Sequence, residues 1–234
     1  MTAATANYKA ADIAKMIDHS LLRPELTQDD IRKGCKIARH YDVAAVCCTS
    51  SDVALCKKEL AGTKVLVAAV VGFPHGYSPT IVKVFEAEQA IKDGADELDM
   101  VLHIGRLLSR DFDYVKSDIA AVVKVAHAHG VRVKVILENC YLTDELKKKG
   151  CELCEQAGAD FVKTSTGFAK GGATLEDLRL MRAAVSAKVE VKAAGGVRDL
   201  DMALKVREIG VTRFGATQTE AIMEEAFRRT GGKA

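Results

Sequence analysis

The chain of 234 residues is 48% hydrophobic, which supplies enough apolar surface for a large buried core and excludes an intrinsically disordered chain. Its 34 basic residues are dispersed among 32 acidic ones, and this balance, with a formal net charge of +2, predicts no nucleic-acid-binding surface. Residues 1–18 contain no apolar segment typical of a signal peptide, and Gly72, Pro74 and Pro79 interrupt the uncharged run at 65–82, so we expect a cytoplasmic protein without a membrane span.

Short apolar runs alternate with amphipathic segments along the chain, which is the pattern of βα units around a parallel sheet. The predicted strands lie near Met16–Asp18, Val43–Cys47, Lys64–Val71, Glu97–Leu102, Val131–Leu137, Phe161–Lys163, Val189–Ala193 and Arg213–Gly215. The predicted helices lie near Gln28–His40, Asp52–Leu60, Pro79–Asp93, Phe112–His129, Asp144–Ala157, Leu175–Ala184, Leu200–Ile209 and Gln218–Arg228.

The mean repeat of about 29 residues matches one βα unit of a (β/α)₈ barrel. No Pro- or Ser-rich linker divides the chain, so we predict a single (β/α)₈ TIM barrel domain over residues 1–234 rather than a doubly wound sheet. Thr27, Ser78 and Thr143 are predicted helix-start residues, and glycines 94, 130, 158 and 210 follow predicted helix ends. No helix shows an exposed apolar face that we assign to an interface.

Cysteine and histidine spacing predicts neither a disulfide framework nor a metal site. The seven cysteines are an odd number, which is typical of reduced thiols. Cys151 and Cys154 have zinc-like spacing but lie within a predicted helix without a second ligand pair, so we interpret them as packing residues. His127 and His129 lie two residues apart at a helix end and face different directions. Since Gly-X-Gly-X-X-Gly and P-loop motifs are also absent, we expect no metal and no cofactor.

Two lysines, Lys163 and Lys192, stand within short apolar strand-like runs. Burial removes water from an ammonium group and lowers its pKa, and the neutral amine is the form that attacks carbonyl groups. These two positions therefore indicate Schiff-base chemistry.

Strand alternation allows five ionisable residues to point into one pocket: Asp18, Asp99, Lys134, Lys163 and Lys192. Repulsion among three amines would lower the pKa of at least one of them further, so we favour a catalytic amine site. The alternatives are ion pairs of the barrel core, or lysines whose ammonium groups reach the rim.

Paired glycines follow two of the last predicted strands, at Gly171-Gly172 and Gly195-Gly196, and Gly215 ends the final strand. Barrels commonly hold a substrate phosphate on backbone N–H groups in these loops, so the pattern indicates a phosphorylated substrate. The alternative is that these glycines only permit tight turns.

From about residue 12 to about residue 220 the chain resembles the deoxyribose-phosphate aldolase family. The resemblance rests on eight motifs: Ile17-Asp-His-Ser-Leu-Leu22, Val71-Gly-Phe-Pro74, Val82-Lys-Val-Phe-Glu-Ala87, Gly94-Ala-Asp-Glu-Leu-Asp-Met-Val101, Lys134-Val-Ile-Leu-Glu138, Cys140-Tyr-Leu-Thr-Asp144, Gly158-Ala-Asp-Phe-Val-Lys-Thr-Ser-Thr-Gly-Phe168 and Gly195-Gly-Val-Arg198. It implies a class I aldolase on a (β/α)₈ barrel that cleaves 2-deoxyribose 5-phosphate through a lysine Schiff base.

The resemblance also implies residue roles. Lys163 would be the nucleophile, Asp99 the acid/base carboxylate and Lys192 the second lysine, supported by Asp18 and Lys134. Substrate or phosphate contacts would fall on Ser20, Cys47, Thr166, Gly167, Gly171, Gly172, Gly195, Gly196 and Thr217. The implied partner is a small sugar phosphate, and relatives of this kind are commonly homodimers.

The chain departs from the family where phosphate hydroxyls are expected. Ala194 stands where a Ser usually precedes the paired glycines, and Ala216 begins a segment that usually carries Ser. Thr217, Thr219 or Lys170 are the candidate replacements. Two alternatives follow: a lysine aldolase with a different or unphosphorylated acceptor aldehyde, and a phosphosugar-binding barrel without turnover.

Overall fold

The computed structural model, which describes residues 8–232, contains a closed barrel of eight parallel strands arranged in chain order. The strands are β1 (Ile17–Leu21), β2 (Ala45–Cys48), β3 (Leu66–Val71), β4 (Glu97–Val101), β5 (Arg132–Ile136), β6 (Phe161–Lys163), β7 (Glu190–Ala193) and β8 (Arg213–Ala216). β8 pairs with β1 and closes the barrel, so the predicted (β/α)₈ fold is confirmed. The domain predicted over residues 1–234 includes residues 1–7 and 233–234, which lie outside the described part.

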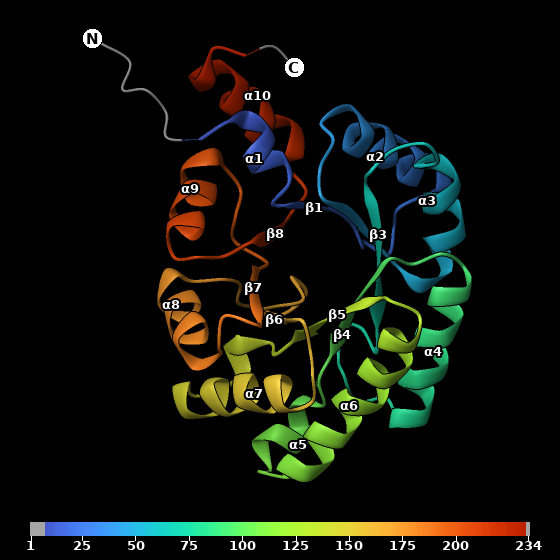
Figure 1. Cartoon of the computed structure of the whole chain (residues 1–234), viewed down its shortest axis with the longest axis vertical. Helices are drawn as coiled ribbons and strands as arrows, with labels where there is room; N and C mark the ends of the chain where they lie inside the picture. Colours follow the sequence, from blue (N-terminus) through green and yellow to red (C-terminus); the bar gives the residue numbers. More distant parts are fainter. Residues whose placement is uncertain (1–7, 233–234) are drawn as a thin grey trace.

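Helices form an outer layer around the strands (Figure 1). They are α1 (Ala10–Ala14), α2 (Gln28–His40), α3 (Val53–Glu59), α4 (Thr80–Lys92), α5 (Ile104–Leu108), α6 (Phe112–Ala128), α7 (Asp144–Gln156), α8 (Leu175–Ala184), α9 (Leu200–Glu208) and α10 (Thr219–Thr230), with short 3₁₀ helices at Ser50–Asp52 and Asn139–Tyr141. No helix among the described residues is long and apolar enough to cross a membrane.

Two short helices, α1 and α5, were absent from the predicted set. Each has five residues, too few to show a helical repeat of apolar positions. The first strand is also longer than expected, because the ladder with β2 continues past Asp18 to Leu21. His19 and Ser20 carry polar side chains that hide the strand pattern there.

Strand residues alternate between two cores. Outward-facing residues such as Leu98, Met100 and Val135 join the large apolar cluster beneath the helices. The barrel interior has a small apolar cluster on one side, formed by Leu22, Ala45, Cys47, Ala68 and Val70. The remaining strands fill the interior with charged side chains, which creates the site described below.

Two of the three predicted helix-start residues form the expected capping hydrogen bonds. Thr27 and Thr143 accept hydrogen bonds from the backbone N–H groups of Asp30 and Leu146, respectively. The assignment at Ser78 is wrong, because Pro79 itself stands at the residue before α4 and no side chain caps that helix.

The expectation that no helix shows an exposed apolar face is also wrong. Ile81 and Phe85, one turn apart on α4, are 74% and 68% exposed, and Tyr77 and Val82 beside them are exposed as well. We call these four residues the α4 face. Their pattern was hidden in the sequence because α4 also packs apolar residues such as Ala87 and Ala90 inward.

Candidate active site

Three lysine side chains converge on one carboxylate inside the barrel. Asp99 on β4 accepts hydrogen bonds from Lys134 at 2.8 Å, from Lys163 at 2.7 Å and from Lys192 at 2.7 Å. Lys192 also forms an ion pair with Asp18. The structure therefore brings together all five residues predicted for the charged pocket, and all five are buried.

The strand register explains this convergence. Lys163 on β6 lies directly beside Lys192 on β7, and Asp99 on β4 lies beside Lys134 on β5. Neighbouring residues of a parallel ladder point to the same side, so each pair faces the interior together. Asp18 enters the same layer from β1, beside Gly215 on β8.

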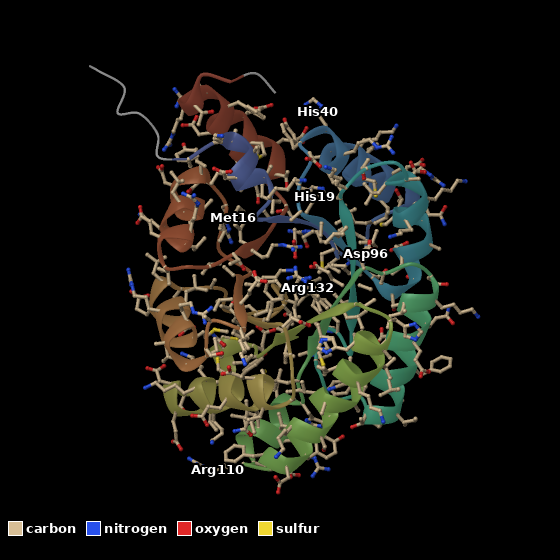
Figure 2. All side chains as sticks on the ribbon, viewed as in Figure 1. Met16, His19, His40, Asp96, Arg110 and Arg132 are labelled. Atoms are coloured by element: carbon tan, nitrogen blue, oxygen red, sulfur yellow. The ribbon has the colours of Figure 1, made fainter. Side chains whose placement is uncertain are left out.

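A second layer of ions supports the first, and its members are not among the predicted site residues. Arg213 on β8 donates to Asp18 at 2.7 Å and to Glu97 at 2.8 Å, and Glu97 also pairs with Lys134 at 2.6 Å. Arg132, labelled near the middle of the barrel in Figure 2, joins Glu97 to Glu190 at 2.9 Å each. Strand alternation could have identified Glu97, because it lies two residues before Asp99 and therefore on the same face of β4.

The cluster holds more cationic groups than carboxylates when all are ionised: Lys134, Lys163, Lys192 and Arg213 face Asp18, Glu97 and Asp99. Lys163 has one carboxylate partner, Asp99, whereas Lys192 has two. Loss of a proton from Lys163 would make the cluster electrically neutral. Lys163 is therefore the amine that most readily becomes a neutral nucleophile.

The pKa shifts agree with this assignment. Burial lowers the pKa of Lys163, and the positive charge of Lys192 lowers it further, while the attraction of Asp99 only partly opposes both. Burial also lowers the pKa of Lys192, but the charges of Asp18 and Asp99 outweigh burial and raise it. The pKa values of the two adjacent lysines are thus shifted in opposite directions, which favours a neutral amine at Lys163 and a charged one at Lys192.

Asp99 and Asp18 remain ionised in this environment. Burial would raise the pKa of Asp99, but the charges of Lys134, Lys163 and Lys192 hold it well below its usual value. Burial likewise acts on Asp18, and the charges of Arg213 and Lys192 outweigh it and lower the pKa. Both carboxylates can therefore accept a proton only when a neighbouring cation has lost its charge.

The opposite wall of the interior is apolar. The Cys47 thiol on β2 lies 3.9 Å from Asp99, and burial raises its pKa, so it is a neutral wall residue. Ser20 on β1 is the register partner of Cys47 and is half-buried. A substrate carbon next to Lys163 would therefore face ionic groups on one side and small apolar groups on the other.

The predicted phosphate-binding glycines meet at the ends of β6 and β7. A Cβ atom on Gly172 would lie 1.4 Å from the backbone oxygen of Gly195, so no other residue fits there. Within the described residues, the N–H groups of Gly171, Gly172, Gly195 and Gly196 donate no hydrogen bond to the protein. Four adjacent free N–H groups are typical of an anion-binding loop.

The structure separates the candidate replacements for the missing hydroxyls. Thr219 is buried, and its hydroxyl lies 2.8 Å from Nδ1 of His19, so it does not face the glycine loops. Thr217 is exposed and donates to Gln218, while Lys170 is exposed between Gly167 and Gly171. Thr217 and Lys170 are therefore the replacements that remain accessible.

Glu138 is a buried site residue that the prediction did not include as a candidate. It follows β5 in a left-handed conformation with φ +58°, and its carboxylate accepts hydrogen bonds from the backbone N–H and the hydroxyl of Thr166. Burial raises the pKa of Glu138, and the Thr166 hydrogen bonds and the charge of Lys163 oppose this shift. Glu138 ends the motif Lys134-Val-Ile-Leu-Glu138, where strand alternation places it on the same face as Lys134. Alternation alone does not predict that the Glu138 carboxylate pairs with Thr166.

Other features of the described residues lie away from this cluster. No group of three or more His, Cys, Asp or Glu residues in the described part is arranged to hold a metal ion. A surface groove of about 560 Å³ lies between α8 and α9, lined by residues such as Arg179, Arg182 and Lys205. It belongs to the outer helix layer, whereas the charged cluster lies inside the barrel.

Comparison with known proteins agrees with the geometry. The model of the DeoC/LacD family aldolases matches residues 12–217. A deoxyribose-phosphate aldolase of Thermococcus gammatolerans is 56% identical over 92% of this chain and 96% of its own length. The solved structure of QR15, an aldolase, is 38% identical with a TM-score of 0.89, covering 93% of this chain and 97% of that one.

A deoxyribose phosphate aldolase from Aeropyrum pernix, described as having a unique tetrameric structure, is 30% identical with a TM-score of 0.86 and covers 93% of this chain and 92% of its own. Sequence and fold agree over nearly the whole described barrel, including the strands that carry Asp99, Lys163 and Lys192. On this evidence, the chain belongs to the DeoC/LacD family of aldolases.

Proposed function

We propose that this chain is a class I aldolase that reversibly cleaves 2-deoxy-D-ribose 5-phosphate to D-glyceraldehyde 3-phosphate and acetaldehyde. The observation that carries the proposal is the contact of the Lys163 amine with Asp99, a carboxylate shared with Lys192. The relatives named deoxyribose-phosphate aldolase support the choice of substrate.

The first step is imine formation. The neutral amine of Lys163 attacks the aldehyde carbon of the open-chain sugar, and the resulting carbinolamine loses water to give a protonated imine. Lys192 stays charged because two carboxylates hold its proton, so it keeps the pKa of Lys163 low before attack. The small apolar wall around Cys47 limits water at the reacting carbon.

The second step breaks a carbon–carbon bond. Removal of the proton from the hydroxyl at C3 forms a carbonyl there, and the electron pair of the C2–C3 bond moves into the imine to give an enamine. Asp99 accepts that proton with the help of Lys192 and later returns a proton to C2. Hydrolysis of the new imine then releases acetaldehyde and restores Lys163.

The phosphate would bind the free N–H groups at the ends of β6 and β7, from Gly171, Gly172, Gly195 and Gly196. We propose Thr217 and Lys170 as the side chains that supply further contacts, because both are exposed, Lys170 directly before Gly171 and Thr217 directly after β8. Ser20, Cys47, Thr166 and Gly167 would contact the sugar between the phosphate and Lys163.

A second candidate is a lysine aldolase whose acceptor aldehyde is unphosphorylated. It is motivated by Ala194, which carries no hydroxyl directly after β7, and by Gln218, which follows β8. Comparison of kcat/KM for 2-deoxyribose and its 5-phosphate separates the two functions. A preference of at least about tenfold for the phosphorylated sugar supports the first proposal, and equal values support the second.

The imine is tested by trapping. Wild-type protein treated with acetaldehyde and borohydride should gain the mass of one reduced adduct on Lys163, located by peptide mapping. Lys163→Met, which keeps the length and apolar character of the side chain, should form no adduct and lose activity by at least about three orders of magnitude.

The matched control is Lys124→Met on α6, because Lys124 is exposed and distant from the cluster. This variant should keep wild-type trapping and turnover. An adduct that persists in Lys163→Met, or that spreads over surface lysines, would refute the assignment of the nucleophile.

We also propose that the protein acts in the cytoplasm as a homodimer. All seven cysteines are free thiols, six of them buried, which suits a reducing compartment. The α4 face of Tyr77, Ile81, Val82 and Phe85 is the surface that we propose joins two copies. A contact between two copies of one helix is self-complementary, as a two-fold dimer requires.

A further inference from the structure

Glu138 occupies a backbone conformation that disfavours it. Its φ of +58° and ψ of +64° are left-handed, a region that residues with a Cβ atom rarely adopt. Its side chain is buried at 2% exposure, where an unpaired carboxylate would be costly. A strained backbone and a buried acid at one residue indicate that the carboxylate has a specific use.

That use is visible in its contacts. The two carboxylate oxygens accept the backbone N–H of Thr166 at 3.3 and 3.2 Å, and one of them also accepts the Thr166 hydroxyl. The hydroxyl oxygen of Thr166 in turn accepts the N–H of Phe168 at 3.0 Å. One carboxylate thus fixes the backbone on both sides of Gly167.

The segment held in this way connects two parts of the site. It begins three residues after Lys163, and the same loop continues to Gly171 and Gly172, which contact Gly195. Further upstream, the N–H of Asn139 donates to the oxygen of Thr164 at 3.0 Å, so the loops after β5 and β6 are joined at adjacent residues. The position of Thr166 therefore determines how far the glycine loops lie from the amine.

We propose that Glu138 is a positioning residue that acts through Thr166 to set the span between the Lys163 amine and the phosphate-binding glycines. This inference rests on the proposed function, because only a phosphorylated substrate must bridge both points. Glu138 touches no reacting atom in this role. A sugar without the phosphate reacts with the amine alone, so its cleavage does not depend on the distance between the amine and the glycine loops.

The test compares 2-deoxyribose 5-phosphate with 2-deoxyribose in wild type and Glu138→Gln. The glutamine keeps the shape but loses the charge and one acceptor oxygen. We expect KM for the phosphorylated sugar to rise about tenfold, while kcat/KM for 2-deoxyribose changes less than about twofold and borohydride trapping of acetaldehyde persists. Glu145→Gln on α7, whose exposed carboxylate pairs with Arg110, is the matched control and should change neither value.

A double-mutant cycle tests the route through Thr166. In a Thr166→Val background, Glu138→Gln should have a smaller effect on KM than it has in wild type, because the contact is already lost. Thermal unfolding of each variant reports whether it is folded. If Glu138→Gln does not fold, Glu138→Asp keeps the charge but draws the carboxylate back from Thr166 by one methylene group, and it must raise KM for the phosphorylated sugar selectively.

The outcomes separate the two proposals. Wild-type protein without cleavage of either sugar would overturn the proposed function. Active wild type with equal losses on both sugars in Glu138→Gln, or with additive effects in the cycle, would overturn the positioning role and leave the function intact.

Discussion

Three lysines share one carboxylate in this barrel, and each has a different set of other charged neighbours. The pKa of Lys163 is lowered because its one carboxylate partner only partly opposes the effect of burial, whereas two carboxylate partners outweigh burial and raise the pKa of Lys192. The sequence predicted both lysines and Asp99, since ionisable residues within apolar runs are unusual. It missed Glu97, Arg213 and Glu138, because their partners come from distant strands and loops.

At this scale, Lys192→Met tests the tuning of Lys163. Removing a positive neighbour leaves Asp99 with one cation fewer and stabilises the charged form of Lys163, so the pKa of Lys163 should rise. The acidic limb of the plot of kcat/KM against pH should therefore move to higher pH. An unchanged profile would refute the role of Lys192, and borohydride trapping at high pH checks that the nucleophile is still present.

At the level of elements, the strands and main helices follow patterns that are local in the sequence. Thr27 and Thr143 cap α2 and α7 as their positions predict. Contacts between elements are different: His19 on β1 and Thr219 on α10 lie 200 residues apart and meet at 2.8 Å. No local pattern relates these two residues, and only closure of the barrel by β8 brings them together.

His19 predicts a pH dependence of stability. Burial lowers its pKa to about 4 from 6.5, so between these values the unfolded chain binds a proton that the folded chain does not. The contribution of His19 is complete above pH 6.5 and is lost as the pH falls to about 4. Urea unfolding should show that His19→Gln loses about 2 kcal/mol less than wild type between pH 7.5 and 5. Equal losses in both proteins would contradict the shift.

At the scale of the whole molecule, closure of the sheet places charged residues from six strands in one buried interior. Helix α4 lies on the side of the barrel opposite α8 (Figure 1), and the residues of the α4 face are exposed to solvent. An exposed apolar face of this kind is typical of a protein–protein contact surface, and the proposed homodimer would remove it from water.

The homodimer is tested by light scattering after size-exclusion chromatography. Wild type should have about twice the chain mass of 25.2 kDa. Phe85→Lys should shift the protein to the monomer, because it places a charge in the centre of the apolar contact. Ala183→Lys on α8 is the control and should stay dimeric. A wild-type protein of monomer mass would refute the interface.

The sequence by itself determined the eight-fold repeat, the helix-start threonines and the identity of the central lysines and Asp99, because each depends on residues close together in the chain. Tertiary structure decided which charges meet, since pairing of Asp99 with Lys192 or of Glu138 with Thr166 requires strand register and barrel closure. It also decided that Thr219 faces His19 rather than the glycine loops, and that the apolar residues of α4 lie on the surface. Helices and strands follow from the spacing of apolar and capping residues along the chain. The charge pairs of the site follow from which strands become neighbours in the barrel.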